Sequence, residues 1–222
     1  MSQKFSRRDF LKVTGLALGG AAVAYSGLGY VAARPPEIST PELVLGKELT
    51  VDKRVLVTYA TRAGSIVEIA NAIGDTLATR GFRAEVKPVK SQPALDGYAA
   101  VILGSAIRMG NWLPEMVKFI EANHAALAAM PTTLFTVHML NTGEDETSRA
   151  AREAYVTSVR ALLSDAENAY FEGAMDFSRL SLLDRFISKM VKAEEADRRD
   201  WDAIKCWAEA VPIDAIAEKG KL

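Results

Sequence analysis

The chain has 222 residues, with 27 basic and 28 acidic side chains, 49% apolar residues and one cysteine. This length and apolar content suit one α/β domain with an appendage and exclude a disordered chain. The net charge of -1 gives no electrostatic basis for binding nucleic acid, so we expect no such partner. One cysteine and two histidines offer neither an internal disulfide nor a cluster of metal ligands, and we predict no metal site.

The N-terminus consists of a charged motif and then an uncharged stretch. Ser6 to Lys12 reads SRRDFLK, and Val13 to Ala33 is rich in glycine and alanine and only mildly apolar. This combination resembles a twin-arginine translocation (Tat) signal. The resemblance implies the Tat export machinery as a partner and a periplasmic location or one on the extracytoplasmic face of a membrane. About 20 apolar residues can cross a bilayer, so residues 13–33 fit a membrane anchor as well as a cleaved signal.

The chain therefore divides into a signal or anchor at residues 1–33, an extended linker at 34–48 and a folded domain at 49–222. Apolar runs predict strands at residues 54–59, 82–89, 99–104, 132–138 and 168–173. Helices are predicted at 66–77, at 146–163, at 200–217, and after Asn111, which we expect to cap a helix with Pro114 in its first turn. Strands separated by single helices predict a doubly wound five-stranded parallel sheet of order 2-1-3-4-5, with helices on both faces.

Residues 174–199 exceed what this fold needs between its fifth strand and its last helix. Apolar residues recur there at helical spacing among basic ones, as Leu183, Phe186, Ile187, Met190 and Val191 show. The pattern predicts an inserted basic amphipathic helix. Two interpretations stay open, a surface facing an apolar substrate or a membrane, and a stripe that packs onto the domain.

Ligands of such sheets bind beyond the carboxyl ends of the strands, and three loops lie there. The first comprises Thr61, Arg62, Ala63, Gly64, Ser65 and Ile66. It offers hydroxyls, a glycine that permits close backbone approach, and a helix N-terminus that attracts an anion. It lacks the lysine of a Walker loop and contains no GxGxxG, so a monophosphate is the expected guest.

The other two loops follow the third and fourth predicted strands. The second comprises Ser105, Ala106, Ile107, Arg108, Met109, Gly110 and Trp112, and the third comprises Leu140, Asn141, Thr142 and Gly143. His138 ends the fourth strand and is either a general base or a hydrogen-bonded structural residue, the latter being favoured because no partner is evident.

These loops resemble those of the flavodoxin superfamily. Thr61 and Gly64 match its FMN-phosphate loop, whereas Ile66 stands where the superfamily usually has a hydroxyl residue. The motif from Gly104 to Gly110 is similar to the branch of quinone-dependent protoporphyrinogen dehydrogenases, and Asp184-Arg185-Phe186 is a weaker similarity. The resemblance covers about residues 53–212 and implies a flavodoxin-like fold.

The resemblance also implies FMN as the cofactor, with its phosphate on the first loop and its ring between the other two. Ile107 and Met109 would pack on the ring, and Trp112 would either stack on it or pack on the domain. Arg108 would balance charge on reduced flavin or bind an anionic substrate, or it would be a solvated arginine on the surface. Asn141, Thr142 and Gly143 would present amides and carbonyls to the polar edge of the ring.

The activity implied is that of an FMN-dependent oxidoreductase passing electrons from a small organic donor to quinone. Alternatives are an exported electron carrier, which the balanced charge disfavours, and an FMN-free binding module, which Ile66 favours. An export signal conflicts with a cytoplasmic haem precursor as substrate. The physiological donor, the acceptor and the oligomeric state therefore stay open.

Overall fold

The computed structural model describes residues 38–47, 53–182, 185–186 and 195–213. The signal or anchor expected at residues 1–33 lies outside these, as do Leu183 and residues 187–194 of the expected inserted helix. The chain forms two compact units, of which the larger comprises Ile38–Asp176 and Glu195–Leu222. The fold and the candidate site described below belong to this larger unit.

Five parallel strands form its centre. They are β2 (Arg54–Ala60), β3 (Arg83–Pro88), β4 (Ala100–Arg108), β6 (Thr132–His138) and β7 (Asn168–Glu172). Their order is β3-β2-β4-β6-β7, with every neighbouring pair parallel. This confirms the predicted flavodoxin-like order 2-1-3-4-5.

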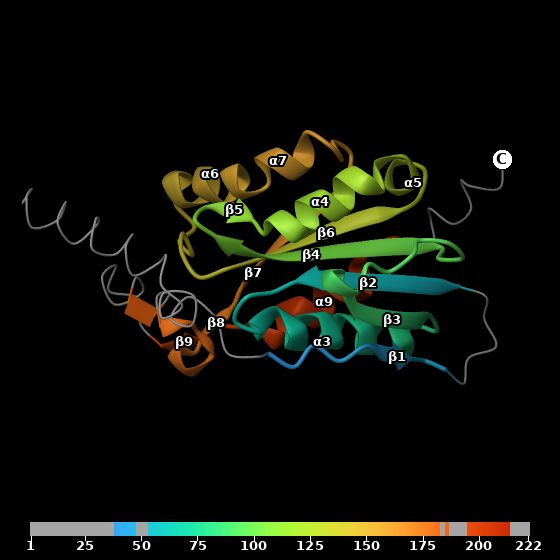
Figure 1. Cartoon of the computed structure of the whole chain (residues 1–222), viewed down its shortest axis with the longest axis horizontal. Helices are drawn as coiled ribbons and strands as arrows, with labels where there is room; N and C mark the ends of the chain where they lie inside the picture. Colours follow the sequence, from blue (N-terminus) through green and yellow to red (C-terminus); the bar gives the residue numbers. More distant parts are fainter. Residues whose placement is uncertain (1–37, 48–52, 183–184, 187–194, 214–222) are drawn as a thin grey trace, which may run out of the picture. The chain divides into compact units, whose positions relative to one another are not determined.

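Helices cover both faces of the sheet (Figure 1). On one face lie α3 (Ser65–Thr79) and α9 (Trp201–Ala210), and on the other α4 (Pro114–Ala122), α5 (His124–Ala128), α6 (Glu146–Tyr155) and α7 (Thr157–Arg160). Alternation along each strand supplies two cores, with Val55 and Val57 in the core that α3 contributes to and Leu56 in the other. Position 104 on β4 requires glycine, because a Cβ built there would lie 2.0 Å from Cζ of Phe135 on the neighbouring strand β6.

Part of the predicted linker is a strand, so the expectation for residues 34–48 was wrong in this part. β1 (Leu43–Leu45) pairs antiparallel with β3, with Leu43 opposite Val86. Leu43 and Leu45 pack against the core, and Gly74 of α3 makes room, since a Cβ there would lie 2.9 Å from Cδ1 of Leu45. The pairing covers an edge that β3 would otherwise expose.

Asn111 does not cap a helix. Instead β5 (Asn111–Trp112) folds back onto β4, with Arg108 opposite Asn111, and Leu113 is the N-cap of α4. Met109 and Gly110 form the intervening two-residue turn with φ of 51° and 76°. Positive φ at both positions is the geometry whose twist matches a tight hairpin.

Two predicted helices are shorter than expected. The helix expected at residues 146–163 divides into α6 and α7 at Val156. The last helix begins after its cap, Asp200, and ends at Ala210, and residues 214–217 of the expected helix lie outside the described residues. Val211 precedes Pro212, and a residue before proline is disfavoured in the helical conformation. Among the described residues, none of the helices is long and apolar enough to span a bilayer.

The inserted segment begins and ends as a small ribbon. β8 (Ala174–Met175) pairs antiparallel with β9 (Ala196–Asp197). The remaining short elements are the 3-10 turns η1 (Val89–Ser91) and η2 (Phe177–Arg179). Of the expected apolar stripe, Phe186 is described, and its side chain is exposed.

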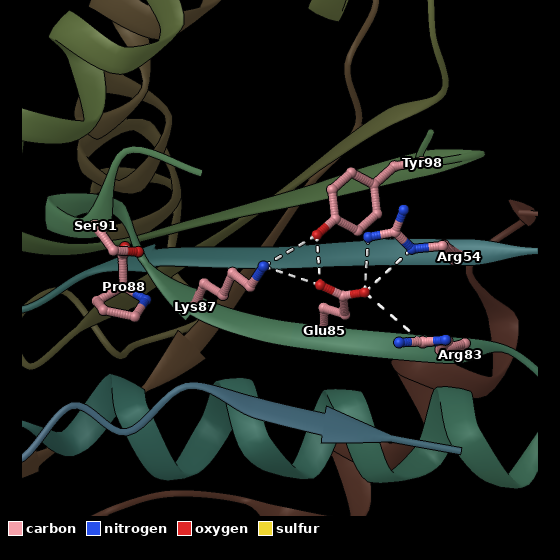
Figure 2. A network of polar contacts seen from close by, with 7 residues as sticks. All are labelled: Arg54, Arg83, Glu85, Lys87, Pro88, Ser91 and Tyr98. Atoms are coloured by element: carbon pink, nitrogen blue, oxygen red, sulfur yellow. Dashed lines mark hydrogen bonds and ion pairs between the residues drawn. The ribbon is translucent and has the colours of Figure 1, made fainter. Parts of the chain in front are cut away.

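A buried carboxylate is surrounded by cations near the β1 edge of the sheet (Figure 2). Glu85 on β3 accepts hydrogen bonds from Arg54 at 2.8 Å and from the Tyr98 hydroxyl at 2.7 Å. Lys87 lies 2.9 Å and Arg83 3.8 Å from the same carboxylate. Burial raises the pKa of Glu85, but the hydrogen bonds from Tyr98, Lys87 and Arg54 outweigh it and lower the pKa to about 2. We call these five residues the edge cluster.

Candidate ligand-binding site at the carboxyl edge of the sheet

The three predicted loops leave the sheet at one edge. Ala60, the last residue of β2, lies opposite Ser105 of β4, and Ala106 lies opposite Val137 of β6. Gly173, just after β7, brings a fourth strand end to this place. A Cβ built on Gly173 would lie 2.9 Å from Val137, 3.4 Å from Ser65 Oγ and 3.6 Å from Met139 Sδ. The fold thus brings the predicted loops together.

The first loop forms a tight turn into α3. Gly64 is the N-cap with φ of 86°, a conformation that favours glycine. Its amide donates to Thr61 Oγ1 at 2.9 Å, and its carbonyl accepts from the amide of Val67 at 3.0 Å. Because glycine has no side chain, the cap residue forms no side-chain hydrogen bond with the amides of the first turn of α3. Those amides suit an anion, because a helix N-terminus carries partial positive charge and donors.

Ile66 differs from the superfamily pattern for a structural reason. Its side chain is fully buried in the core that also contains Val57 and Ile69. At this position the side chain therefore stabilises the attachment of α3 to the sheet, and the backbone amide is the group that a ligand can reach. Ser65, next to it, is half-buried and retains a hydroxyl at the loop.

Two arginines, Arg62 and Arg199, form ion pairs next to this loop. Arg62 is exposed and lies 3.3 Å from Glu115 in the first turn of α4. Arg199, which follows β9, donates to Glu68 in the first turn of α3 and to Asp197 at 2.8 Å. Its guanidinium also lies 4.6 Å from the centre of the Trp201 ring. The segment that returns from the insert therefore lies against the start of α3.

Two residues of the second loop, Ser105 and Trp112, have side chains that point into the core. Trp112 is 2% exposed and donates from Nε1 to Thr136 Oγ1 at 2.9 Å. Ser105 is fully buried, and its hydroxyl donates to the carbonyl of Ala106 while accepting from the amide of Leu113. Both side chains fasten the hairpin of β4 and β5 to the core. The burial of Trp112 agrees with the packing alternative.

The rest of the second loop is accessible. Met109, at the tip of the hairpin turn, is 91% exposed, and Arg108 is exposed beside it. Ala106 and Ile107 are half-buried, and nothing lies within 4 Å of a Cβ built on Gly110. The turn therefore presents an apolar side chain and an unobstructed backbone to an adjacent ligand.

The third loop is held from beneath by Arg152 of α6. Arg152 is buried, and its Nη1 donates to the carbonyls of Asn141 at 2.7 Å and Gly143 at 2.6 Å. Asn141 has φ of 59°, a left-handed conformation uncommon outside glycine. Arg152 therefore occupies one lone pair on each of two carbonyls that we expect to face a ligand, and each keeps a second lone pair. The loop also carries backbone amides and the exposed side chain of Leu140.

Tyr155 and His138 complete this support. Asn141 Nδ2 donates to the Tyr155 hydroxyl at 2.6 Å, and that hydroxyl donates to the carbonyl of Leu140 at 3.3 Å. His138 Nδ1 lies 2.9 Å from the same carbonyl. Because a carbonyl only accepts, Nδ1 carries the proton. We call Arg152, Tyr155 and His138 the loop cluster.

The environment of His138 supports its structural interpretation. Its side chain is 4% exposed, between the rings of Tyr155 and Tyr170. Burial lowers the pKa of His138, which the hydrogen bond to the Leu140 carbonyl partly opposes. The imidazole is therefore neutral at physiological pH and holds the start of the third loop.

Arg152, Tyr155 and Arg199 were not among the predicted site residues. Arg152 and Tyr155 are three residues apart in a predicted helix, so they share a face, and that spacing was an available signal. Arg199 belongs to a run of charges typical of a solvated segment. Nothing in the sequence distinguishes it from Arg198, which is exposed.

Comparison with known proteins bears on this site. A family model described as a flavodoxin domain matches residues 56–202. Protoporphyrinogen IX dehydrogenase (quinone) of Escherichia coli strain K12 is 24% identical over 170 residues, covering 71% of this chain and 94% of that protein. The Leishmania major protein of the same name is 26% identical over 169 residues, covering 70% of this chain and 73% of its own length.

Among solved structures, a flavodoxin from the domain Archaea is similar at 18% identity with a TM-score of 0.42. The likeness covers 76% of this chain and 99% of that one. The range matched by the family model contains all three loops described above.

Proposed function

Since this chain belongs to the flavodoxin domain family, we propose that it binds FMN at the carboxyl edge of the sheet and acts as an oxidoreductase. The observation that carries the proposal is the turn at Gly64, which leads into a helix N-terminus suited to a phosphate. When bound, FMN supplies the capacity to accept and pass on a hydride or electrons. The protein's own task is then to bind and orient the cofactor.

The residues present suit each part of FMN. The amides of Ser65 and Ile66 and the hydroxyls of Thr61 and Ser65 would hold the phosphate. Met109 and Leu140 are exposed apolar side chains on the second and third loops, and they would contact the apolar ring. The amides of Thr142 and Gly143 would serve the polar edge of the ring, in a loop whose shape the loop cluster sets.

For the reaction, we propose electron transfer from an organic donor to a quinone, as the names of the two relatives state for those proteins. An electron carrier without an organic donor is the alternative. This alternative predicts that the bound flavin can be reduced and reoxidised, but that the protein oxidises no hydrophobic donor when quinone is present.

The test is a titration of the purified full chain with FMN, in which the quenching of flavin fluorescence measures binding. Gly64→Val should weaken FMN binding about tenfold or more, since lost hydrogen bonds to a charged group are worth about 1.5–3 kcal/mol. Gly81→Val is the matched control, because Gly81 also has positive φ, at 93°, but lies beyond the other end of α3.

Equal affinities of Gly64→Val and Gly81→Val would place the phosphate elsewhere. A wild-type protein that is colourless and ignores added FMN would contradict the redox function and leave the FMN-free binding module.

We further propose that the chain is exported by the Tat route, on the motif from Ser6 to Lys12. Replacing Arg7 and Arg8 together by lysine keeps the charge and should abolish export in a cell-fractionation assay. Unchanged export of this double variant would refute the proposal.

A further inference from the structure

We propose that Arg199 is a positioning residue for the phosphate of FMN, because it neutralises a carboxylate at the helix N-terminus that the phosphate would approach. The inference rests on the FMN site proposed above and assigns a role to a residue outside the three loops. It is argued from the position of Glu68, from the way Arg199 is held, and from the path of the chain that carries Arg199.

Glu68 lies in the first turn of α3 and is 44% exposed at its side chain. An acidic residue in a first turn stabilises a helix, because it complements the partial positive charge there. At the same position, its negative charge repels an anion that binds to the helix N-terminus. One helical turn spans about 5.4 Å, which is less than the Debye length of about 8 Å at physiological salt, so the charge of Glu68 would act on a phosphate bound at the first amides. Each cation that pairs with Glu68 reduces this repulsion, and Arg199 is one of them.

The Arg199 guanidinium, which pairs with this carboxylate, is restricted in its conformation by its neighbours. Its side chain is 10% exposed, and it donates to Glu68 and to Asp197 while lying over the Trp201 ring at 4.6 Å. A fixed, largely buried cation is screened less by salt than an exposed one. The hydrogen bonds to Asp197 and Glu68 raise the pKa of Arg199 against the effect of burial, so it stays charged.

The path of the chain keeps Arg199 beside the phosphate loop. The amide of Arg198 donates to the carbonyl of Gly173 at 3.1 Å. Gly173 in turn lies against the loop, since a Cβ built on it would be 3.4 Å from Ser65 Oγ. The segment returning from the insert is thus fastened to the end of β7 and supplies its cation to the start of α3. Arg62, a cation in the loop itself, is exposed and paired with Glu115.

The test measures dissociation constants for FMN and for riboflavin, which has the same ring and no phosphate. Arg199→Gln should weaken FMN binding about twofold to fivefold, the range expected for one charge at a helix end. The loss should shrink near 1 M salt, where the Debye length falls to about 3 Å. Riboflavin binding should not change. Adding Glu68→Gln to Arg199→Gln should restore the wild-type affinity for FMN.

Arg198→Gln is the matched control, because it removes the same charge from the exposed neighbour and should leave FMN binding unchanged. A double variant as weak as Arg199→Gln would overturn the inference, since the arginine would then act on the phosphate itself or on the fold. Equal losses for FMN and riboflavin would overturn it as well. Wild-type affinity in Arg199→Gln would refute this inference alone, whereas a wild-type protein that binds neither flavin would refute the proposed function too.

Discussion

The edge cluster and the loop cluster both bury charge or polar groups, but they bind different partners. In the edge cluster, Glu85 binds side chains that project from β2, from β3 and from the segment before β4 (Figure 2). In the loop cluster, Arg152 binds two backbone carbonyls, and Tyr155 binds a third. The edge cluster connects elements that are already rigid, whereas the loop cluster determines the backbone path of the third loop.

This difference separates stability from ligand binding. Side-chain pairs between strands raise the free energy of unfolding without shaping a site at the far edge of the sheet. Hydrogen bonds to loop carbonyls decide which way the neighbouring amides point, because each peptide unit is planar. Loss of the edge cluster should therefore destabilise the protein without affecting FMN, and loss of the loop cluster should affect both.

The largest effect is expected for Glu85→Gln. It leaves the partly exposed Arg54 and Lys87 without their buried counter-charge, and the charge-assisted hydrogen bonds that it removes should be worth about 3 kcal/mol together. Urea denaturation should show this loss, while the FMN dissociation constant stays at the wild-type value. Glu121→Gln removes an exposed carboxylate on α4 and should change neither. A comparable loss in both variants would mean that net charge, not the cluster, matters.

The Glu85 carboxylate should also determine how the free energy of unfolding decreases at acidic pH. The pKa of Glu85 falls from 4.5 to about 2 on folding, so its contribution is complete above pH 4.5 and is lost as the pH falls towards 2. This difference corresponds to about 3 kcal/mol at neutral pH. The gap in unfolding free energy between wild type and Glu85→Gln should therefore narrow between pH 5 and pH 2. A gap that is constant over this range would show that folding does not lower the pKa of Glu85.

Arg152→Met should have an intermediate effect on stability and a clear one on FMN. Methionine keeps the apolar stem but leaves the carbonyls of Asn141 and Gly143 without their donor, at a cost of about 2 kcal/mol. FMN should bind more weakly, because the third loop is free to change its course. Arg149→Met, on the exposed side of the same helix, should be neutral in both assays. Unchanged FMN affinity in Arg152→Met would remove the distinction between the two clusters.

The smallest effect is expected for Tyr155→Phe. It removes one hydroxyl that bridges Asn141 and Leu140, which should cost about 1 kcal/mol and weaken FMN binding less than Arg152→Met does. Tyr59→Phe is a suitable contrast. Its hydroxyl is buried with no hydrogen-bond partner among the described residues, so its removal should not destabilise the protein. Melting temperatures of the two variants check the prediction.

Features that depend on neighbouring residues were predictable from the sequence alone. The strand at Thr132–His138 was predicted to the residue, and the order of the sheet followed from the alternation of strands and helices. The turn at Gly64 was predictable because a glycine between a buried strand and a helical pattern marks it. The same local signals predict the place of all three loops, since parallel strands end at one edge.

Only the tertiary structure decided which side chains of those loops face inwards and what supports them. Trp112 is internal because its indole meets Thr136, which is 24 residues away. Arg199 belongs to the site because it meets Glu68, 131 residues earlier. β1 exists because the edge of β3 is there to pair with it. Each of these outcomes depends on a partner that is distant in the chain, and a local pattern carries no information about such a partner until the sheet brings the two together.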